Sequence, residues 1–245
     1  MTWNMRHSSY WKSSLACLGL GALVTLANPA PAENSQWDEA EIGRTCPGLA
    51  AWVERHSQAV AADKPDPVPP TDPELRTQLL DRMQKDQQVR SELFGPGKPL
   101  PTDDSDGMRR LKAVDDDNLA ALYRIVADYD IPTRALVGGD GIKAFWLLVQ
   151  HAQDTRLQQR VLAAFTSIPD SGVPLSDIAL LDDRINSNQG RPQKYGTQFK
   201  GFGKDLAMAP VEDEAHLDER REKMGLPPIA DYRCMLNLMY GGPQH

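Results

Sequence analysis

One segment near the middle of the chain predicts a helix that is apolar on every side. Between Ile142 and Ala152, large apolar residues fall on both faces of a 100° helical wheel. A helix of this kind is buried rather than amphipathic. Gln150 and His151 close the segment, so we expect both polar side chains to lie in a low-dielectric environment, where they need hydrogen-bonding partners.

The rest of the chain alternates helical periodicity with turns, and this pattern predicts an all-α fold. Apolar stripes at helical spacing predict further helices from about residues 47, 73, 115, 155, 176 and 211. Residues 186–210 carry no such signal, and we expect an irregular segment there, with residues 195–199 as a short strand or an ordered loop. No alternating pattern occurs twice in a pairable way, so we predict a single multi-helical domain.

Several local signals predict where these helices begin and end. Thr71 to Glu74 has the form of a capping box with proline in the first turn, and Asp115 to Asp117 suits the start of the next helix. Asp140 is the expected N-cap of the buried helix. The last clear helix is predicted from about Val211 to Met224, where Gly225 ends it.

The first 32 residues have the organisation of a secretory signal. Arg6 and Lys12 supply positive charge without any acidic residue, and the apolar run from Leu15 to Ala27 is too short to span a bilayer. A small-residue cleavage pattern ends at Ala32. We therefore expect an exported protein, periplasmic or secreted, with an uncleaved N-terminal anchor as the alternative.

Cleavage would leave an acidic chain. The removed segment carries two basic residues, so the mature balance is 27 − 2 − 34 = −9. Such a chain lacks the basic surface that binding to a nucleic acid backbone requires. No later segment is apolar enough to cross a membrane. The glycines at 138, 139 and 141 do not match a phosphate-binding loop, and no cofactor motif is found.

The mature chain would keep two cysteines, Cys46 and Cys234. An even pair in an oxidising compartment predicts a disulfide, although two separate buried thiols remain possible. The bridge would join an N-terminal helical arm at residues 33–63 to the end of the chain. A proline-rich linker at residues 64–72 separates this arm from the helical domain at residues 73–245.

The helix predicted after residue 73 carries charge on its apolar side. Leu75 and Leu79 define a stripe that also contains Asp86 and Arg90, with Gln87 at its edge. Residues four apart on a helix can pair. This pair is either a structural ion pair or the partner that Gln150 and His151 need.

Several segments, in the same order along the chain, resemble the domain-of-unknown-function family DUF6624. They lie between about Leu75 and Tyr232 and include M-Q-K-D-Q-Q-V-R (83–90), V-G-G-D-G-I-K-A-F-W-L-L-V-Q-H-A (137–152), A-L-L-D-D-R (179–184) and G-R-P-Q-K-Y-G-T-Q-F (190–199). No activity is assigned to the family, so the resemblance implies no reaction. Where the family has Asp after Gln-His-Ala, this chain has Gln153, with Asp154 one position later. If that carboxylate were catalytic, this chain would be impaired or would use the shifted residue.

The candidate site combines both lines of reasoning. The helical wheels and the resemblance agree on Asp86, Arg90, Gln150 and His151. The resemblance alone adds Gln87, Asp183, Arg184, Gln193, Tyr195, Thr197 and Gln198. We assign His151 as the general base and either Asp86 or Asp183 as the carboxylate that orients it. The side-chain amides suit a small polar ligand, because each offers a donor and an acceptor.

Three functions remain open from the sequence. The polar cluster could be a closed network that only joins helices, with Asp183 and Arg184 as a solvated surface pair. It could bind, and hydrolyse, a small polar ligand, which is the hypothesis we adopt. The chain could also be a protein-interaction module, such as a periplasmic inhibitor or immunity protein with an unidentified partner. A metal site is disfavoured, since His151 and Asp154 have no further ligand at a suitable spacing.

Overall fold

The computed structural model describes residues 43–60, 69–94, 101–102, 104–167, 172–201 and 205–240. The expected signal segment, its cleavage site at Ala32, the start of the N-terminal arm and most of the proline-rich linker lie outside these residues. The described helices are α4 (Pro47–Val60), α5 (Pro73–Leu93), α6 (Asp106–Tyr129), α7 (Arg134–His151), α8 (Thr155–Ser167), α9 (Leu175–Asn188), α10 (Leu217–Lys223) and α11 (Ile229–Tyr240). Two short strands, β1 (Phe199–Lys200) and β2 (Ala207–Met208), pair antiparallel. The predicted all-α fold is confirmed.

The chain divides into two compact units. The helical unit contains Lys64–Phe94 and Lys98–Ile185, and the disulfide unit contains Met1–Asp63, Gly95–Gly97 and Asn186–His245. Helix α4 of the expected N-terminal arm therefore groups with the C-terminal part of the chain. Each unit is described by itself below.

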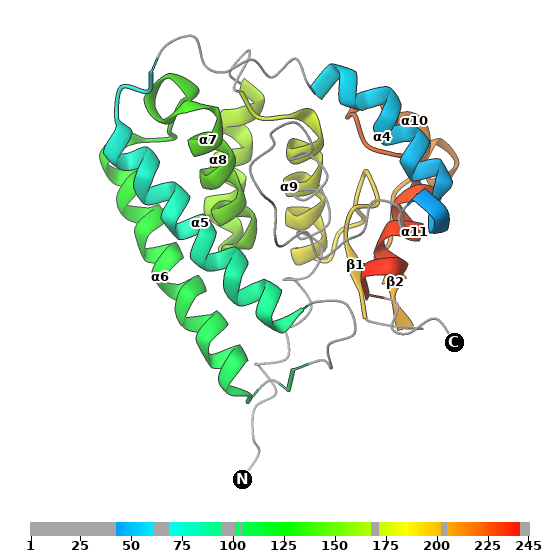
Figure 1. Ribbon diagram of the computed structural model, residues 1–245, viewed down its shortest axis with the longest axis horizontal. Coiled ribbons are helices and arrows are strands. Elements are labelled where there is room, and N and C mark those ends of the chain that lie inside the picture. The colour runs from blue at the N-terminus through cyan, green and yellow to red at the C-terminus, as the bar shows by residue number, and fades with distance from the viewer. Residues whose placement is uncertain are drawn as a thin grey trace. The chain divides into compact units, whose positions relative to one another are not determined.

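In the helical unit, α5 and α6 lie side by side and both pack on α7 (Figure 1). Helix α7 is buried along almost its whole length, and Phe145 and Val149 are fully enclosed. Leu75 and Leu79 of α5 are buried as their stripe predicts. The buried central helix that the sequence predicted is thus the core element of this unit.

Two helices in this unit begin earlier than the sequence signals indicate. Helix α6 starts at Asp106, where the side chain of Ser105 accepts a hydrogen bond from the Met108 amide, so Asp115 lies in mid-helix. Helix α7 starts after its N-cap Thr133, and Asp140 lies inside it. In both cases a hydroxyl cap upstream starts the helix before the acidic residue that was predicted at its start, Asp115 in the first turn and Asp140 as the N-cap.

The start of α5 differs from the prediction by one residue. The N-cap is Asp72, whose carboxylate accepts a hydrogen bond from the Leu75 amide at 2.8 Å, rather than Thr71. Thr71 instead bonds through its backbone amide to the Ala135 carbonyl of α7. The proline at position 73 takes the first helical turn as expected.

Gly138 introduces a kink near the start of α7. Its φ of 75° and ψ of 171° are non-helical and lie in a region that residues with a Cβ rarely adopt. A short helical turn before Gly138 therefore joins the longer buried segment at an angle. This kink lets the first turn of α7 bond to the start of α5 while the rest of the helix enters the core.

The disulfide unit holds α4 against α11, with α10 beside α11. Helix α4 begins at Pro47, as predicted, and Leu49 is fully buried. Helix α11 was not predicted, although Tyr232, Met235 and Leu236 on one of its faces are buried. The helix predicted from Val211 is correct only in its second half.

The reason for this shorter helix is a backbone pairing upstream. Gln193 donates its amide to the Pro210 carbonyl at 2.8 Å, and its own carbonyl accepts from the Glu212 amide at 2.9 Å. Asp213 then adopts a left-handed conformation with φ 47°, and α10 begins only at Leu217. The chain around residue 211 is therefore part of the irregular segment.

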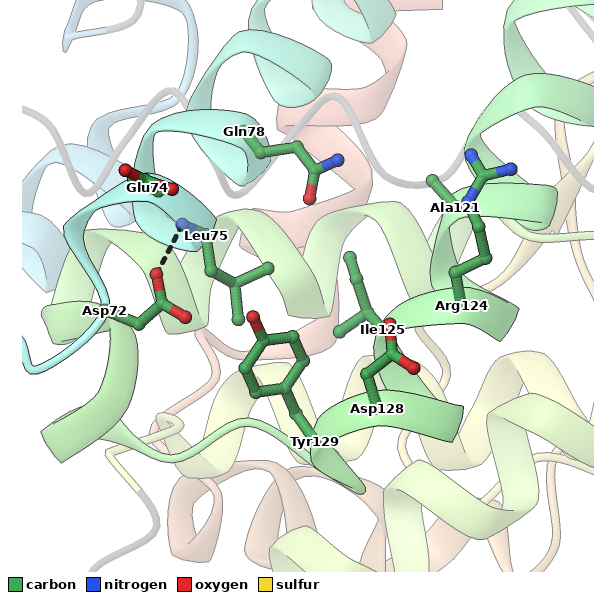
Figure 2. Close-up of a pocket in the computed structure, with 9 residues that line it drawn as sticks. All are labelled: Asp72, Glu74, Leu75, Gln78, Ala121, Arg124, Ile125, Asp128 and Tyr129. Atoms are coloured by element: carbon green, nitrogen blue, oxygen red, sulfur yellow. Dashed lines mark hydrogen bonds between the residues drawn. The ribbon is translucent and has the colours of Figure 1, made fainter.

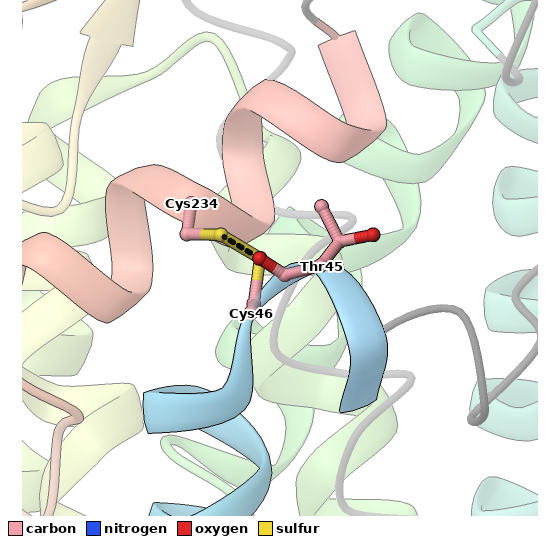
Figure 3. Close-up of a disulfide and its surroundings, with 3 residues drawn as sticks. All are labelled: Thr45, Cys46 and Cys234. Carbon is pink, nitrogen blue, oxygen red and sulfur yellow. Dashed lines mark hydrogen bonds between the residues drawn. A yellow bond between two sulfur atoms is a disulfide. The ribbon is translucent and has the colours of Figure 1, made fainter.

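The predicted disulfide is present. Cys46, at the start of α4, is bonded to Cys234 of α11, with the two Cα atoms 5.8 Å apart (Figure 3). The sulfur of Cys234 also lies 3.4 Å from the carbonyl oxygen of Thr45. The bridge spans a sequence separation of 188 residues and fastens the packing of α4 on α11.

Candidate functional site

Three helices of the helical unit bring charged side chains into its core. Helix α5 supplies Asp86 and Arg90, α6 supplies Asp115, and α7 supplies His151. Their exposed fractions are 0%, 0%, 6% and 3%, so the whole group is enclosed by protein. We refer to these four residues as the ionic cluster.

Arg90 lies at the centre of the ionic cluster. Its Nε lies 3.2 and 3.3 Å from the two carboxylate oxygens of Asp86, and its Nη2 donates to Asp115 at 2.5 Å. His151 Nδ1 lies 2.6 Å from Asp86 Oδ2 and 2.9 Å from Arg90 Nε. The Asp86–Arg90 pair contacts His151, which is one of the two alternatives that the helical wheels left open, whereas Gln150 finds a different partner.

The charge of Asp86 decides which atom holds the proton in this arrangement. Burial alone would raise the pKa of the Asp86 carboxyl, but the charges and hydrogen bonds of His151 and Arg90 outweigh burial and hold that pKa well below its usual range. An ionised Asp86 accepts hydrogen bonds only. We therefore infer that His151 Nδ1 carries a proton and donates it to Asp86, while Arg90 Nε–H donates to the same carboxylate.

Burying the charged side chains of the ionic cluster costs free energy, so each charge needs a partner of opposite sign. Removing ions from water costs several kcal/mol for each ion, which a buried pair recovers only with good geometry and further hydrogen bonds. Asp86 and Asp115 both pair with the guanidinium of Arg90, and the Nδ1–H of His151 gives Asp86 a further hydrogen bond. Gln87 adds a further donor, because its Nε2 lies 3.0 Å from Asp86 Oδ2.

The C-terminal end of α7 is fixed by amide side chains. Gln150, which is fully buried, donates through Nε2 to the Leu180 carbonyl of α9 at 3.3 Å. Gln158 of α8, also fully buried, donates through Nε2 to the carbonyls of Val149, Gln150 and Ala152 at 3.2, 3.4 and 2.9 Å. The turn that carries His151 is thus held from two neighbouring helices.

A comparison with protein-family models finds one that matches residues 73–243, the family of unknown function DUF6624. This match covers most of the chain. The chain belongs to DUF6624. No curated protein and no solved structure matches it.

Gln153, where the resemblance implies a departure from the family pattern, lies just after the ionic cluster. Gln153 is exposed, and its Nε2 lies 3.5 Å from the His151 carbonyl. Asp154 is the N-cap of α8, since its Oδ1 accepts from the Arg156 and Leu157 amides at 2.9 Å each. The Tyr123 hydroxyl bonds to its other oxygen. The shifted carboxylate therefore has a structural role in starting α8.

Two further predicted site residues, Asp183 and Arg184, lie on α9. Their exposed fractions are 0% and 1%, so the alternative of a solvated surface pair is wrong. Asp183 lies away from the apolar stripe of α9, yet it is buried because the helix is covered on more than one side. Leu180 and Leu181 on adjacent faces are buried as well.

The predicted site residues of the irregular segment belong to the disulfide unit. Gln193, which is fully buried, donates to the carbonyls of Gln198 and Ala209 at 3.0 and 2.8 Å and accepts from the Gln198 amide at 2.8 Å. Gln198 in turn donates to the Thr197 hydroxyl at 3.0 Å. These side chains replace the missing regular hydrogen bonds of the segment.

Arg221 of α10 completes this second polar group, and its role was not predicted. It is fully buried, donates to the Pro227 carbonyl at 2.6 Å and bonds to the Tyr195 carbonyl. Its guanidinium lies 4.8 Å from the ring centroid of Tyr232, whose hydroxyl donates to the Thr197 carbonyl at 3.1 Å. Together these contacts order the segment that carries Tyr195 and Thr197.

Asp115 and Gln158 were also missed, and only Asp115 had a usable signal. Once α6 is extended upstream, Asp115 falls on the buried stripe between Leu111 and Asn118. If the helix is assumed to begin at Asp115, this residue lies in the first turn and its place on the buried stripe cannot be recognised. Gln158 lies beside Leu157 at the flank of a stripe, where spacing alone does not separate a buried amide from an exposed one.

A groove of about 430 Å³ lies in the helical unit between the start of α5 and the end of α6 (Figure 2). It is lined by Asp72, Glu74, Leu75, Gln78, Ala121, Arg124, Ile125, Asp128 and Tyr129. A hydrogen bond to Asp72 raises the pKa of the Tyr129 hydroxyl. The groove shares no residue with the ionic cluster, so it is a separate surface feature.

No group of three or more His, Cys, Asp or Glu residues in the described ranges is arranged to hold a metal ion. Across the same part of the chain, no helix combines the length and apolar character needed to cross a membrane.

Asp177, in the first turn of α9, gives the helical unit a pH dependence. Burial raises the pKa of its carboxyl to about 7, against the opposing charge of Lys143 and the preference of a helix N-terminus for a carboxylate. Because the folded-state pKa lies above the unfolded value of about 3.9, stability from this group is highest below about pH 4 and falls until about pH 7. We expect Asp177→Asn to gain about 1–2 kcal/mol at pH 8, which is less than the full pKa shift implies because the residue is half-buried rather than fully enclosed. Urea unfolding at pH 4 and pH 8 tests this, and an equal effect at both values contradicts it.

Proposed function

We propose that this DUF6624 protein is exported and binds a small polar ligand at the ionic cluster, with His151 as the residue that acts on it. The observation that supports this is the contact of 2.6 Å between His151 Nδ1 and Asp86 Oδ2 in a fully enclosed site. A carboxylate in that position orients an imidazole and fixes which nitrogen carries the proton. The signal-like N-terminus and the disulfide fit an oxidising compartment.

In the proposed hydrolysis, His151 in its neutral form acts as the general base. Since Nδ1 carries a proton that it donates to the Asp86 carboxylate, Nε2 is the nitrogen that takes a proton from the attacking water. That water adds to the ligand's electrophilic carbon, and the same proton then passes to the leaving group. Asp86 stabilises the imidazolium between these two steps. Within the helical unit, Gln87, Arg90, Gln150 and Arg184 remain the proposed ligand-recognition residues, and Asp183 is the alternative to Asp86 as the orienting carboxylate.

A thermal-shift experiment tests the proposal. Amino acids, dipeptides, nucleosides and monosaccharides serve as probes with the full chain. A ligand at 100 times its Kd stabilises the folded state by about 2.7 kcal/mol, which corresponds to a rise in Tm of about 5–10 °C for a domain of this size. We expect one class of probe to give such a rise in the wild type and none in His151→Ala.

His216 offers a matched control for this substitution. It forms the same kind of pair, with Nδ1 2.9 Å from Asp213 Oδ2, but both side chains are more than half exposed. His216→Ala should keep the full ligand response. A probe response that survives in His151→Ala, or no response from any probe class, counts against the proposed function.

The near-complete burial of the ionic cluster favours a second function. A closed network that only joins α5, α6 and α7 suits a non-enzymatic interaction or inhibitor module, because buried ionic groups contribute to specificity of packing more than to stability. On this alternative, His151→Ala lowers Tm strongly without any ligand being found. An unchanged or raised Tm in His151→Ala supports the binding site, since functional sites are often locally strained.

A further inference from the structure

Gln158 occupies an unusual place relative to His151. It belongs to α8, yet its side-chain amide reaches the last turn of α7 and bonds to the carbonyls of Val149, Gln150 and Ala152. These carbonyls flank His151 on both sides. Gln158 has no exposed surface, so water does not take its place.

The last carbonyls of any helix lack partners within that helix. At an exposed end, water supplies the missing donors. Helix α7 ends in the core, where an unsatisfied carbonyl costs about 1–3 kcal/mol, and the Ala152 amide satisfies only the Leu148 and Val149 carbonyls. Gln158 supplies donors for the carbonyls on either side of His151, and so fixes the backbone of the turn from which His151 projects.

We infer that Gln158 is the positioning residue of His151. By holding the last turn of α7, it keeps His151 Nδ1 within hydrogen-bonding distance of Asp86, which lies on a different helix. Within the described part of the chain, the Gln158 side chain bonds to backbone carbonyls, and it takes no part in the chemistry of the ionic cluster. The inference deepens the proposed function, because it concerns the residue on which that function rests.

Nuclear magnetic resonance of the histidine rings tests this role directly. Long-range ¹H–¹⁵N spectra of the full chain report which ring nitrogen carries a proton, and His151→Ala identifies the His151 signals. We expect the wild type to show an Nδ1–H resonance shifted downfield by its hydrogen bond to Asp86. Gln158→Met fills the same space without a donor, and we expect it to lose this resonance.

Val161→Ala is the matched control for stability. Val161 lies one turn along α8 and is fully buried, and its side chain offers no donor to the end of α7. The control should lower Tm while keeping the Nδ1–H resonance. If Gln158→Met does not fold, Gln158→Asn decides instead: it keeps the amide but is one methylene shorter, so we expect partial loss of the same signal.

Two results overturn the inference: an unchanged resonance in the folded Gln158 variant, or an equal loss in Val161→Ala. Neither measurement needs a ligand. A lost resonance together with a failed ligand screen therefore rejects the proposed function alone. A retained resonance together with a His151-dependent ligand response rejects the positioning role alone.

Discussion

Arg90→Met is expected to lower the free energy of unfolding by about 3–5 kcal/mol. Methionine fills most of the volume of the arginine side chain, so the loss comes from the charge rather than from a cavity. Without the guanidinium, the carboxylates of Asp86 and Asp115 remain buried and lose the cation that lies between them. Urea unfolding of both proteins at pH 7 gives the difference directly.

Arg82→Met provides the control on the same helix. Arg82 pairs with Asp117 at 2.6 Å, but the Asp117 side chain is 67% exposed, and an exposed pair contributes about 0–1 kcal/mol.

Because the pKa of Asp86 is lowered on folding, the stability that this carboxylate provides is present above about pH 3.9 and is lost as the pH falls further. The difference between wild type and Arg90→Met should therefore shrink in acid. Equal losses in Arg82→Met and Arg90→Met at pH 7 contradict this account.

Replacing both Cys46 and Cys234 by serine is expected to cost about 5 kcal/mol. In the chain-entropy model, a disulfide stabilises by restricting the unfolded chain, and the effect grows with the length of the closed loop. The sequence separation of 188 residues is long for a single bridge. Thermal or urea unfolding of the wild type and the double variant, both without reductant, measures the loss.

Reduction of the wild type offers an independent check on the same bond. Dithiothreitol should move the wild-type unfolding midpoint to that of the double serine variant and leave the variant itself unchanged. Alkylation of the unfolded, unreduced protein should modify neither Cys46 nor Cys234 in a peptide map. A loss well below the typical 2–4 kcal/mol for a disulfide, or alkylation of either residue, contradicts the prediction.

The sequence predicted the parts of the ionic cluster that follow from periodicity. Asp86 and Arg90 interrupt an apolar stripe four residues apart, and His151 ends a helix that is apolar all round. Each pattern places a side chain inward without reference to the rest of the fold. The same reasoning did not identify Asp115, because its position on the buried stripe can be recognised only when the true start of α6 is known.

The irregular segment shows where local patterns stop being informative. Gln193 bonds to Gln198, Ala209 and Pro210, and no helical or strand period links these positions. Helix α11 was missed because proline and glycine before residue 229 suggested that regular structure had ended. The helical spacing of Tyr232, Met235 and Leu236 did carry a signal for α11, whereas the bonds of Gln193 follow no period.

The division of the chain between its two units has a consequence for the order of folding. Apart from residues 95–97, the helical unit is encoded within residues 64–185, whereas the disulfide unit needs both Cys46 and the segment after residue 186. During synthesis the helical unit is complete first, so it is able to fold before the disulfide unit has been made. Cys46 therefore has no Cys234 to bond with until α11 has been made. A chain interrupted before Cys234 would present Cys46 to other thiols and form mixed disulfides.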